Sequence, residues 1–273
     1  MTKKFGIIGN PIKHSLSPVL HNYWFEKYKI DAKYSIIEVT ENNLPEIVKK
    51  IKNEELKGIN ITLPFKQKIV PHLDILVNDA EVTSSVNTVY LDKKKTIVGD
   101  NTDVFGLQAA YLKEVDNASS KKALVIGAGG VSPSVILSLQ KSGVQNISIV
   151  NRTREKCIFL KKKFKNLDIV EWENLKETIK IHDIIINATS LGLKSGHDFD
   201  FNFENTKNNL IYIDTIYNPL ETKTLLYLKE RGVKVFNGLE MFIYQGQKAF
   251  YLWNKINPEI DQNLIELLLS KLK

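Results

Sequence analysis

The chain has 273 residues, which suits one large or two modest domains. Its 43% hydrophobic and 25% charged content is ordinary for a globular protein, and its apolar runs are far shorter than the ~18–20 residues of a membrane helix. The only cysteine, Cys157, excludes an internal disulfide and the C-x₂-C pairs of zinc sites. The apolar run after the basic start MTKK is too short for a signal peptide, so we expect a cytoplasmic protein without a structural metal.

The net charge of +7 comes from 38 basic and 31 acidic residues. The lysines are scattered along the chain, and there is no basic arm, aromatic stacking motif or zinc finger. Charge alone is weak support for nucleic-acid binding. We therefore expect a small anionic ligand as the partner, and neither a nucleic acid nor a membrane.

Segments typical of strands and helices alternate along the first hundred residues. Strands are predicted over 4–9, 33–39 and 57–62, helices over 17–28 and 43–53, and a hairpin over 86–99. Ser17 suits the N-cap of its helix, and Pro18 suits the first helical position. This βαβ order predicts an open, mostly parallel sheet with helices on its faces.

A second alternating series begins near residue 104. It contains a helix over 105–115, a strand, glycine turn and helix over 121–143, and strand ends within 146–153, 183–190 and 209–219. Two helices are predicted to close the chain after residue 235. We predict two α/β domains, the second of Rossmann type, with a boundary near 101–105 and a second crossing near 237.

The glycine turn of the second series has the context of a dinucleotide site. A strand that ends at Ile126 runs into Gly127-Ala128-Gly129-Gly130, and Ser132-Pro133 then suits the N-cap and first position of a helix. Glycines in such a turn let backbone N–H groups approach a pyrophosphate at the helix N-terminus. Ser132 takes the place of the usual third glycine, and an ordinary βα turn is the alternative interpretation.

The end of the next strand bears on the choice of nucleotide. NAD sites place an acidic residue there to bind the ribose hydroxyl, but this chain has Asn151-Arg152-Thr153-Arg154. The chain contains three arginines, and two of them lie in this tetrapeptide. Because cations oppose the dipole at a helix N-terminus, the cluster favours a bound anion, and we predict the 2′-phosphate of NADP.

Polar side chains follow the predicted strands of the first domain. They are Ser15, Ser17, Asn60, Thr62, Lys66, Asn87, Asn101 and Asp103. Ligands of open parallel sheets bind beyond the carboxyl ends of the strands, and this set suits a small polyhydroxylated acid. Plainer interpretations are an N-cap for Ser17 and turn positions for Asn87 and Asn101. We expect His14 and His21 at the surface or as capping groups, and Cys157 as a small buried hydrophobe.

Nine short segments of the chain resemble, in order and spacing, those of the shikimate dehydrogenase family. They are GNPIKHSLSPVLHN, NITLPFK, VNT, GDNTD, GAGG, NRT, NATSLG, DTIYNP and NGLEMFIYQG. Each segment alone is a weak signal, but nine in order over nearly the full length are specific. Members of this family use NADP(H) to interconvert 3-dehydroshikimate and shikimate, on the route to chorismate and the aromatic amino acids.

The resemblance implies two domains with an active-site cleft between them. The substrate domain would be discontinuous, residues 1–103 and 238–273, and residues 104–237 would form the NADP-binding Rossmann domain. Lys66 matches the family's catalytic lysine, which donates and accepts the proton, and Asp103 matches the carboxylate beside it. Substrate contacts are implied for Ser15, Ser17, Asn60, Thr62, Asn87, Tyr217 and Gln245. Contacts with NADP are implied for Gly127, Ala128, Gly129, Gly130, Val131, Asn151, Arg152, Thr153, Lys156, Thr189, Thr215 and Gly238.

The chain departs from the family pattern at Pro133, Cys157 and Thr215, none of which touches the implied chemistry. One alternative is a quinate/shikimate dehydrogenase with relaxed substrate or NAD use, against which Ser15-x-Ser17 and the absence of an acidic residue at 151 argue. Another is a non-catalytic nucleotide-binding protein on the same fold, which predicts loss of Lys66 or Asp103. We expect a monomer or a homodimer.

Overall fold

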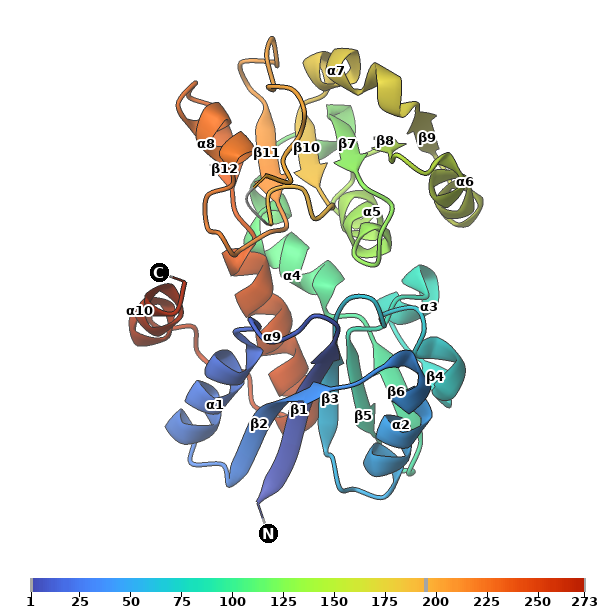
Figure 1. The fold of residues 1–273 in the computed structure, drawn as a ribbon, viewed down its shortest axis with the longest axis vertical. Helices are drawn as coiled ribbons and strands as arrows, with labels where there is room; N and C mark the ends of the chain where they lie inside the picture. Colours follow the sequence, from blue (N-terminus) through green and yellow to red (C-terminus); the bar gives the residue numbers. More distant parts are fainter. Residues whose placement is uncertain (1, 194–195, 273) are drawn as a thin grey trace. The chain divides into compact units, whose positions relative to one another are not determined.

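The computed structural model describes residues 2–193 and 196–272. The chain divides into two compact units, of which unit 1 is Met1–Gly106 with Ile243–Lys273 and unit 2 is Leu107–Phe242. Two helices, α4 (Asp103–Ala110) and α9 (Leu239–Asn254), span the points of division (Figure 1). The two compact units divide a few residues after positions 103 and 237, where the domain limits were expected. The expected domain limits themselves stay a prediction.

Unit 1 is built on a six-stranded sheet in the order β2-β1-β3-β5-β6-β4. Its strands are β1 (Lys3–Gly9), β2 (Ala32–Glu38), β3 (Gly58–Ile61), β4 (Ile75–Leu76), β5 (Thr88–Leu91) and β6 (Ile97–Asp100). β5 runs antiparallel to both neighbours, and the other pairs are parallel, which confirms the predicted hairpin. The start of β5 therefore lies at the same edge as the ends of β1, β3 and β6.

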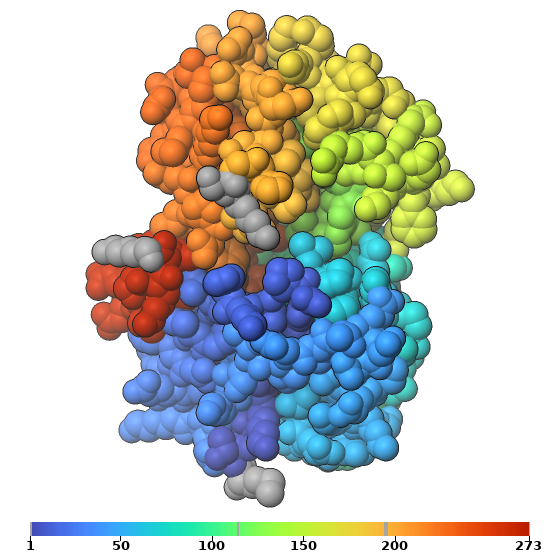
Figure 2. All heavy atoms as spheres, in the orientation of Figure 1, coloured from blue at the N-terminus to red at the C-terminus, as the bar shows by residue number. Residues whose placement is uncertain are grey.

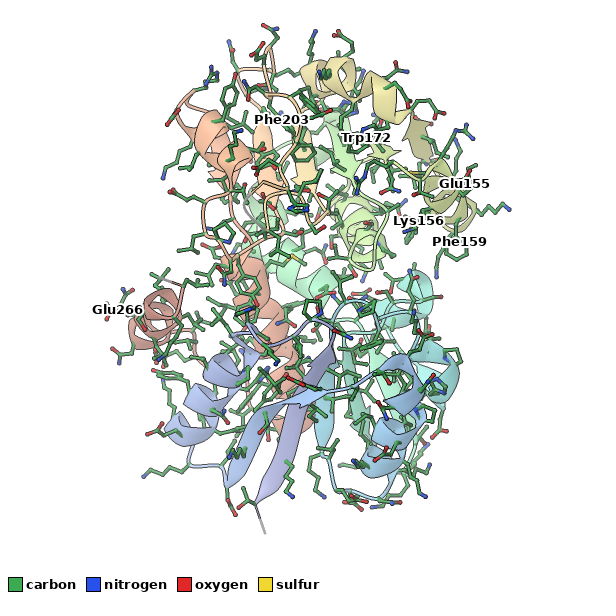
Figure 3. All side chains as sticks on the ribbon, in the orientation of Figure 1. Glu155, Lys156, Phe159, Trp172, Phe203 and Glu266 are labelled. Carbon is green, nitrogen blue, oxygen red and sulfur yellow. The ribbon has the colours of Figure 1, made fainter. Side chains whose placement is uncertain are left out.

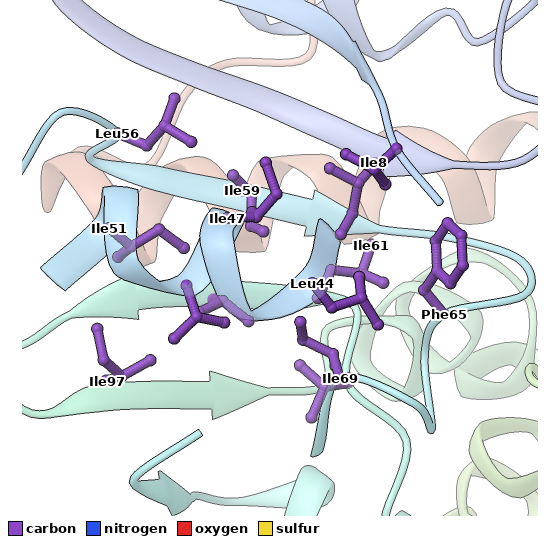
Figure 4. Packing of buried hydrophobic residues seen from close by; sticks show 14 of the residues in the cluster. Ile8, Leu44, Ile47, Ile51, Leu56, Ile59, Ile61, Phe65, Ile69 and Ile97 are labelled. Carbon is purple, nitrogen blue, oxygen red and sulfur yellow. The ribbon is translucent and has the colours of Figure 1, made fainter. Parts of the chain in front are cut away.

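The helices of unit 1 cover both faces of this sheet (Figure 1). They are α1 (Ser17–Lys27), α2 (Leu44–Lys52), α3 (Asp79–Thr83) and the later part of α9, while α10 (Gln262–Ser270) packs on α1. On one face, α2 presents Leu44, Ile47 and Ile51, spaced three and four residues apart, to the side chains of β1 and β3 (Figure 4). This apolar stripe explains why α2 packs flat on the sheet.

An aromatic layer covers the opposite face of the sheet. Phe5 of β1 contacts Phe25 of α1 and Trp253 of α9, with ring centroids 5.2 and 5.1 Å apart. His21 belongs to this layer and is fully buried, stacked on Tyr34 at 4.4 Å. The expectation of a surface or capping role for His21 is therefore wrong, because it faces the core from the inner side of α1.

Unit 2 is an all-parallel sheet in the order β12-β11-β10-β7-β8-β9. Its strands are β7 (Lys122–Ile126), β8 (Asn146–Val150), β9 (Leu167–Val170), β10 (Ile184–Asn187), β11 (Ile211–Asp214) and β12 (Lys234–Phe236). Its helices include α5 (Ser132–Lys141), α6 (Arg154–Lys163), α7 (Leu175–Thr178) and α8 (Lys223–Lys229). The central strand β10 is buried throughout, as expected for a sheet covered on both faces.

The strand order of unit 2 reverses between β7 and β10, which is the position where doubly wound sheets bind nucleotides. The glycine turn follows β7 directly. The predicted α/β class, with a Rossmann-type second part, is confirmed. Short 3₁₀ turns complete the chain at Glu41–Asn43, Val70–His72, Leu112–Glu114, Ala118–Ser120, Trp172–Asn174 and Ile179–Ile181.

Candidate active site

Lys66 and Asp103, predicted as the catalytic pair, lie together in unit 1. Lys66 Nζ donates to Asp103 Oδ2 over 2.5 Å, and the two side chains are only 10% and 7% exposed. Lys66 follows β3, and Asp103 is the first residue of α4, after β6. Each charge offsets the desolvation cost of the other, so the pair holds a buried amine beside a buried carboxylate.

Asn87 fixes the other oxygen of the Asp103 carboxylate. Its Nδ2 donates to Asp103 Oδ1 over 2.8 Å, while its Oδ1 accepts from Thr102 N over 2.8 Å. Asn87 Nδ2 also lies 3.3 Å from Gln245 Oε1, so α9 brings a residue from late in the chain to this edge of the sheet. Both carboxylate oxygens of Asp103 are thus oriented by partners from different strand ends.

The helix α4 begins at Asp103 because Asn101 caps it. Asn101 Oδ1 accepts from Asp103 N over 3.1 Å, and Asn101 Nδ2 donates to Ser85 O over 2.7 Å. The predicted helix over 105–115 therefore starts two residues too late. Asn101, for which a turn role was the plainer interpretation, is a buried capping residue that sets the position of Asp103.

Ser15 and Ser17 lie at the start of α1. Ser15 Oγ accepts from Ser17 N over 3.2 Å and lies 3.2 Å from Ser17 Oγ. The prediction of Ser17 as N-cap is wrong, because the helix begins at Ser17 itself and Leu16 already has helical backbone angles. Ser15, two residues earlier, is the residue whose hydroxyl satisfies the first N–H of the helix.

Asn60 is held inside unit 1 by Asn87 and by two residues that the sequence did not single out, Tyr34 and Thr88. Its Oδ1 accepts from Tyr34 OH over 2.8 Å, and its Nδ2 lies 3.1 Å from both Asn87 O and Thr88 Oγ1. Asn60 is 4% exposed, whereas Thr62, just beyond the end of β3, is half-buried. Thr88 and Thr102 belong to the VNT and GDNTD segments and could have been found there; Tyr34 carries no such signal.

A groove of about 370 Å³ lies where β1 and β2 end. Its lining includes Lys13, His14 and Glu38, and Lys13 lies 3.7 Å from the Glu38 carboxylate. The segment after β1, dark blue in Figure 2, reaches the surface of unit 1 here. The exposed position expected for His14 is confirmed.

The glycine turn of unit 2 combines one position that requires glycine with one that faces open space. Gly127 has φ +111°, and a Cβ there would lie 2.8 Å from Ala188 O, so only glycine fits. A Cβ at Gly129 would meet no atom within 4 Å, so the backbone there faces open space. The prediction of Ser132 as N-cap is wrong: α5 begins at Ser132, Val131 precedes it, and Ser132 Oγ accepts from Gly129 N over 2.9 Å.

The residues after β8 divide into two groups. Asn151 Oδ1 accepts from Ala128 N over 3.2 Å and so joins the strand end to the glycine turn. Arg152 and Lys156 are exposed, and Lys156 extends outward from α6 (Figure 3). Arg154 instead pairs with Glu171, its Nε 2.5 Å from the carboxylate. Of the two clustered arginines, only Arg152 is therefore placed to suit a phosphate, and the exposed Lys156 is a second cation near it in the sequence.

The remaining predicted ligands lie at the ends of β10, β11 and β12. Thr189 Oγ1 donates to Asn187 Oδ1 over 2.7 Å, and Thr215 Oγ1 donates to Asn187 O over 2.8 Å. Gly238 has no room for a side chain, since a Cβ would lie 2.4 Å from Thr215 O. Tyr217, predicted to contact substrate, lies in unit 2 and stacks on Phe242 at 4.7 Å.

Neither a membrane helix nor a metal cluster occurs in the part of the chain that the structure describes. No helix within 2–193 and 196–272 is long and apolar enough to cross a membrane. Within the same residues, no group of three or more His, Cys, Asp or Glu side chains is arranged to hold a metal ion. Cys157 is buried, as predicted.

Known proteins match the chain over almost its whole length. Residues 7–89 match the family described as "Shikimate dehydrogenase substrate binding domain", and residues 110–215 match "Shikimate / quinate 5-dehydrogenase". A "Shikimate dehydrogenase (NADP(+))" of Pelagibacter ubique is 47% identical over 268 residues, which are 98% of this chain and 99% of that protein.

Solved structures give the same result. The shikimate dehydrogenase of Aquifex aeolicus is 35% identical, with a TM-score of 0.88 over 100% of this chain and 98% of that one. The enzyme of Thermus thermophilus, solved with NADP(H) and shikimate, is 30% identical, with a TM-score of 0.87 over 99% of this chain and 100% of that one. The chain belongs to the shikimate dehydrogenase family.

Proposed function

We infer that the chain catalyses the NADPH-dependent, reversible reduction of 3-dehydroshikimate to shikimate, a step in the biosynthesis of chorismate and the aromatic amino acids. The observation that carries this inference is the buried Lys66–Asp103 pair, held by Asn87 within a chain that matches the family from end to end. A non-catalytic relative would have no use for this pair, which costs desolvation free energy to bury.

We propose that Lys66 transfers the proton. During reduction the carbonyl oxygen of the substrate gains negative charge, and the ammonium of Lys66 donates a proton to it; in the reverse direction the amine accepts the proton. Asp103, oriented by Asn87, holds Lys66 Nζ in place and is available to a substrate hydroxyl. General acid–base help of this kind contributes roughly 10²–10⁴ in rate.

NADPH, when bound, supplies the hydride. The open backbone at Gly129 suits its pyrophosphate, and the exposed Arg152 and Lys156 suit its 2′-phosphate, so the residues present fit the cofactor. Thr189, Thr215 and Gly238 would line the nicotinamide side. Ser15, Ser17, Asn60, Thr62, Tyr217 and Gln245 stay predicted substrate contacts, together with Asn87.

The alternative is an enzyme that also oxidises quinate or uses NAD, since the family description of residues 110–215 includes both substrates. The Ser15 and Ser17 pair and the cationic Arg152 favour shikimate and NADP. Initial rates from NADPH absorbance, with shikimate and quinate each offered with NADP and with NAD, test the proposal. Turnover of quinate at a rate equal to that of shikimate would establish the alternative.

We also propose a cytoplasmic location and a monomer or homodimer. The location is supported by the single cysteine, because proteins of oxidising compartments commonly carry paired cysteines. Fractionation of the cells and the mass of the purified chain in solution test these two points.

A further inference from the structure

We propose that Asp214 is a positioning residue for the cofactor: its buried carboxylate joins the loops after β10 and β11 and so fixes Thr189 and Thr215. The proposal rests on the proposed function in that these loops face the nicotinamide. Neither the resemblance nor the catalytic pair assigns a role to Asp214.

Asp214 is the last residue of β11 and is fully buried. Its Oδ1 accepts from Ile216 N over 3.0 Å and from Asn187 Nδ2 over 3.2 Å. Its Oδ2 accepts from Thr222 Oγ1 over 2.9 Å. The three donors come from the loop after β11, the end of β10 and the N-cap of α8, so one carboxylate joins three segments.

Asn187 connects Asp214 to two of the predicted cofactor residues, Thr189 and Thr215. Its Oδ1 accepts from Thr189 N over 3.1 Å and from Thr189 Oγ1 over 2.7 Å. Its backbone oxygen accepts from Thr215 N over 3.1 Å and from Thr215 Oγ1 over 2.8 Å. A rotation of the Asn187 amide would break contacts of Thr189. Asp214 Oδ1 and the backbone oxygen of Leu191, 3.1 Å away, both accept from Asn187 Nδ2 and hold this amide in one orientation.

These loops have little freedom to shift, because two glycines lie against them. A Cβ at Gly127 would lie 2.8 Å from Ala188 O and from Thr189 Cγ2. A Cβ at Gly238 would lie 2.4 Å from Thr215 O. A displacement of Thr189 would therefore reach the glycine turn, so the effect of Asp214 is expected on cofactor affinity as a whole.

The partners of Asp214 are neutral. No lysine, arginine or histidine forms an ion pair with it among residues 2–193 and 196–272. The ionisable groups that interact with it electrostatically are Tyr212 on β11 and Tyr111 after α4, and both have a raised pKa, chiefly through burial. Burial raises the pKa of Asp214 to about 6, against the opposing effect of its hydrogen bonds.

Protonation of Asp214 adds a donor and removes an acceptor where three donors converge, so it should loosen the network as pH falls through about 6. The test is the dissociation constant of NADPH from pH 5 to 8, measured by its fluorescence without substrate. The 2′-phosphate of NADPH also titrates at about pH 6, so the informative quantity is the difference in pH dependence between wild type and Asp214→Asn. Asn cannot be protonated there and is nearly isosteric with Asp.

We expect affinity for NADPH to fall more steeply with acidity in the wild type than in Asp214→Asn. We also expect Asp214→Ala to weaken NADPH about tenfold at pH 7.5 while KM for shikimate changes less than about twofold. Parallel pH profiles in wild type and Asp214→Asn, or equal losses for NADPH and shikimate in Asp214→Ala, would overturn the proposal. Absence of shikimate turnover with NADPH binding intact would instead refute the proposed function alone.

Discussion

Asp103 in unit 1 and Asp214 in unit 2 are both buried carboxylates beside a strand end, but their charges are balanced differently. Asp103 pairs with the ammonium of Lys66, whereas Asp214 is held by an amide, a hydroxyl and a backbone N–H. The first arrangement places an ammonium group directly against the carboxylate. In the second, none of the described residues pairs a cation with the ionised form, so burial moves the pKa of Asp214 to about 6.

Burial alone therefore does not define a catalytic carboxylate. A carboxylate that works with a proton carrier needs that carrier within hydrogen-bond distance, and we propose that Lys66 is this carrier for Asp103. A carboxylate surrounded by neutral donors works as an acceptor that organises the backbone. Substitutions in the two units should separate these two uses.

The largest effect is expected for Lys66→Ala. Removal of the amine should lower kcat by about 10²–10⁴, because proton transfer to the substrate oxygen loses its donor. Initial rates from NADPH absorbance measure this, with Lys68→Ala as the control, since Lys68 is exposed and pairs with Glu41. Turnover near the wild-type rate in Lys66→Ala would contradict a proton-transfer role, and near-ultraviolet circular dichroism checks that the variant is folded.

A smaller effect is expected for Arg152→Ala. The dissociation constant of NADPH should rise about tenfold or more, while that of NADH changes little, because only NADPH carries the 2′-phosphate. Arg154→Ala is the matched control, since Arg154 pairs with Glu171. If Arg154→Ala discriminated between the cofactors as strongly as Arg152→Ala, the assignment of the two arginines would be wrong.

The sequence was sufficient for much of unit 1 and of the glycine turn. Lys66, Asp103 and Gly127 lie in segments whose residue types and spacing indicate a physical role. At Gly127, for example, the backbone has a positive φ that only glycine suits. Both helix starts that rested on a serine N-cap were displaced by one residue. At Ser17 and Ser132 the preceding residue already has helical angles, and the proline that follows fits near the helix start.

The roles of Asp214 and His21 could not be predicted because they depend on long-range pairing. Asp214 meets Asn187 since β10 and β11 run parallel with these two residues in register. His21 is buried because α1 turns it toward Tyr34 and α9 covers it. Neither register nor helix rotation is encoded in a local motif, and the charge of a side chain favours the surface interpretation.

Asp214→Asn should also change stability, in a pH-dependent way. The folded pKa of about 6 lies above the ordinary value of 3.8, so the contribution of Asp214 is fully present below about pH 4 and is lost as pH rises through about 6. Above that pH the buried charge costs up to about 3 kcal/mol. We expect Asp214→Asn to raise Tm at pH 8 and to leave it nearly unchanged at pH 4. The exposed Asp168→Asn is the control, and an equal Tm difference at both pH values would count against the shift.

His21 should show the opposite pH dependence, and its effect at neutral pH is expected to be the smallest. Both ring nitrogens are buried, and no described residue hydrogen-bonds to them. Burial lowers the pKa of His21 to about 3; the nearby Asn60 amide opposes this shift but lies outside hydrogen-bond geometry. At pH 7.5 we expect His21→Phe to change the free energy of unfolding by less than about 1 kcal/mol, because no hydrogen bond is lost and the ring stacking is kept.

As pH falls the two proteins should diverge. The folded pKa lies below the ordinary value of 6.5, so the stability contributed by neutral His21 is present above pH 6.5 and is lost as pH falls toward about 3. By pH 5 the wild type should lose about 2 kcal/mol from this residue, and His21→Phe should lose none of it. Urea unfolding at pH 7.5 and 5, with the exposed His14→Ala as control, measures the difference. If wild type and His21→Phe lost equal stability between these pH values, His21 would have to be protonated in the folded protein at pH 5. That outcome would contradict the lowered pKa of His21.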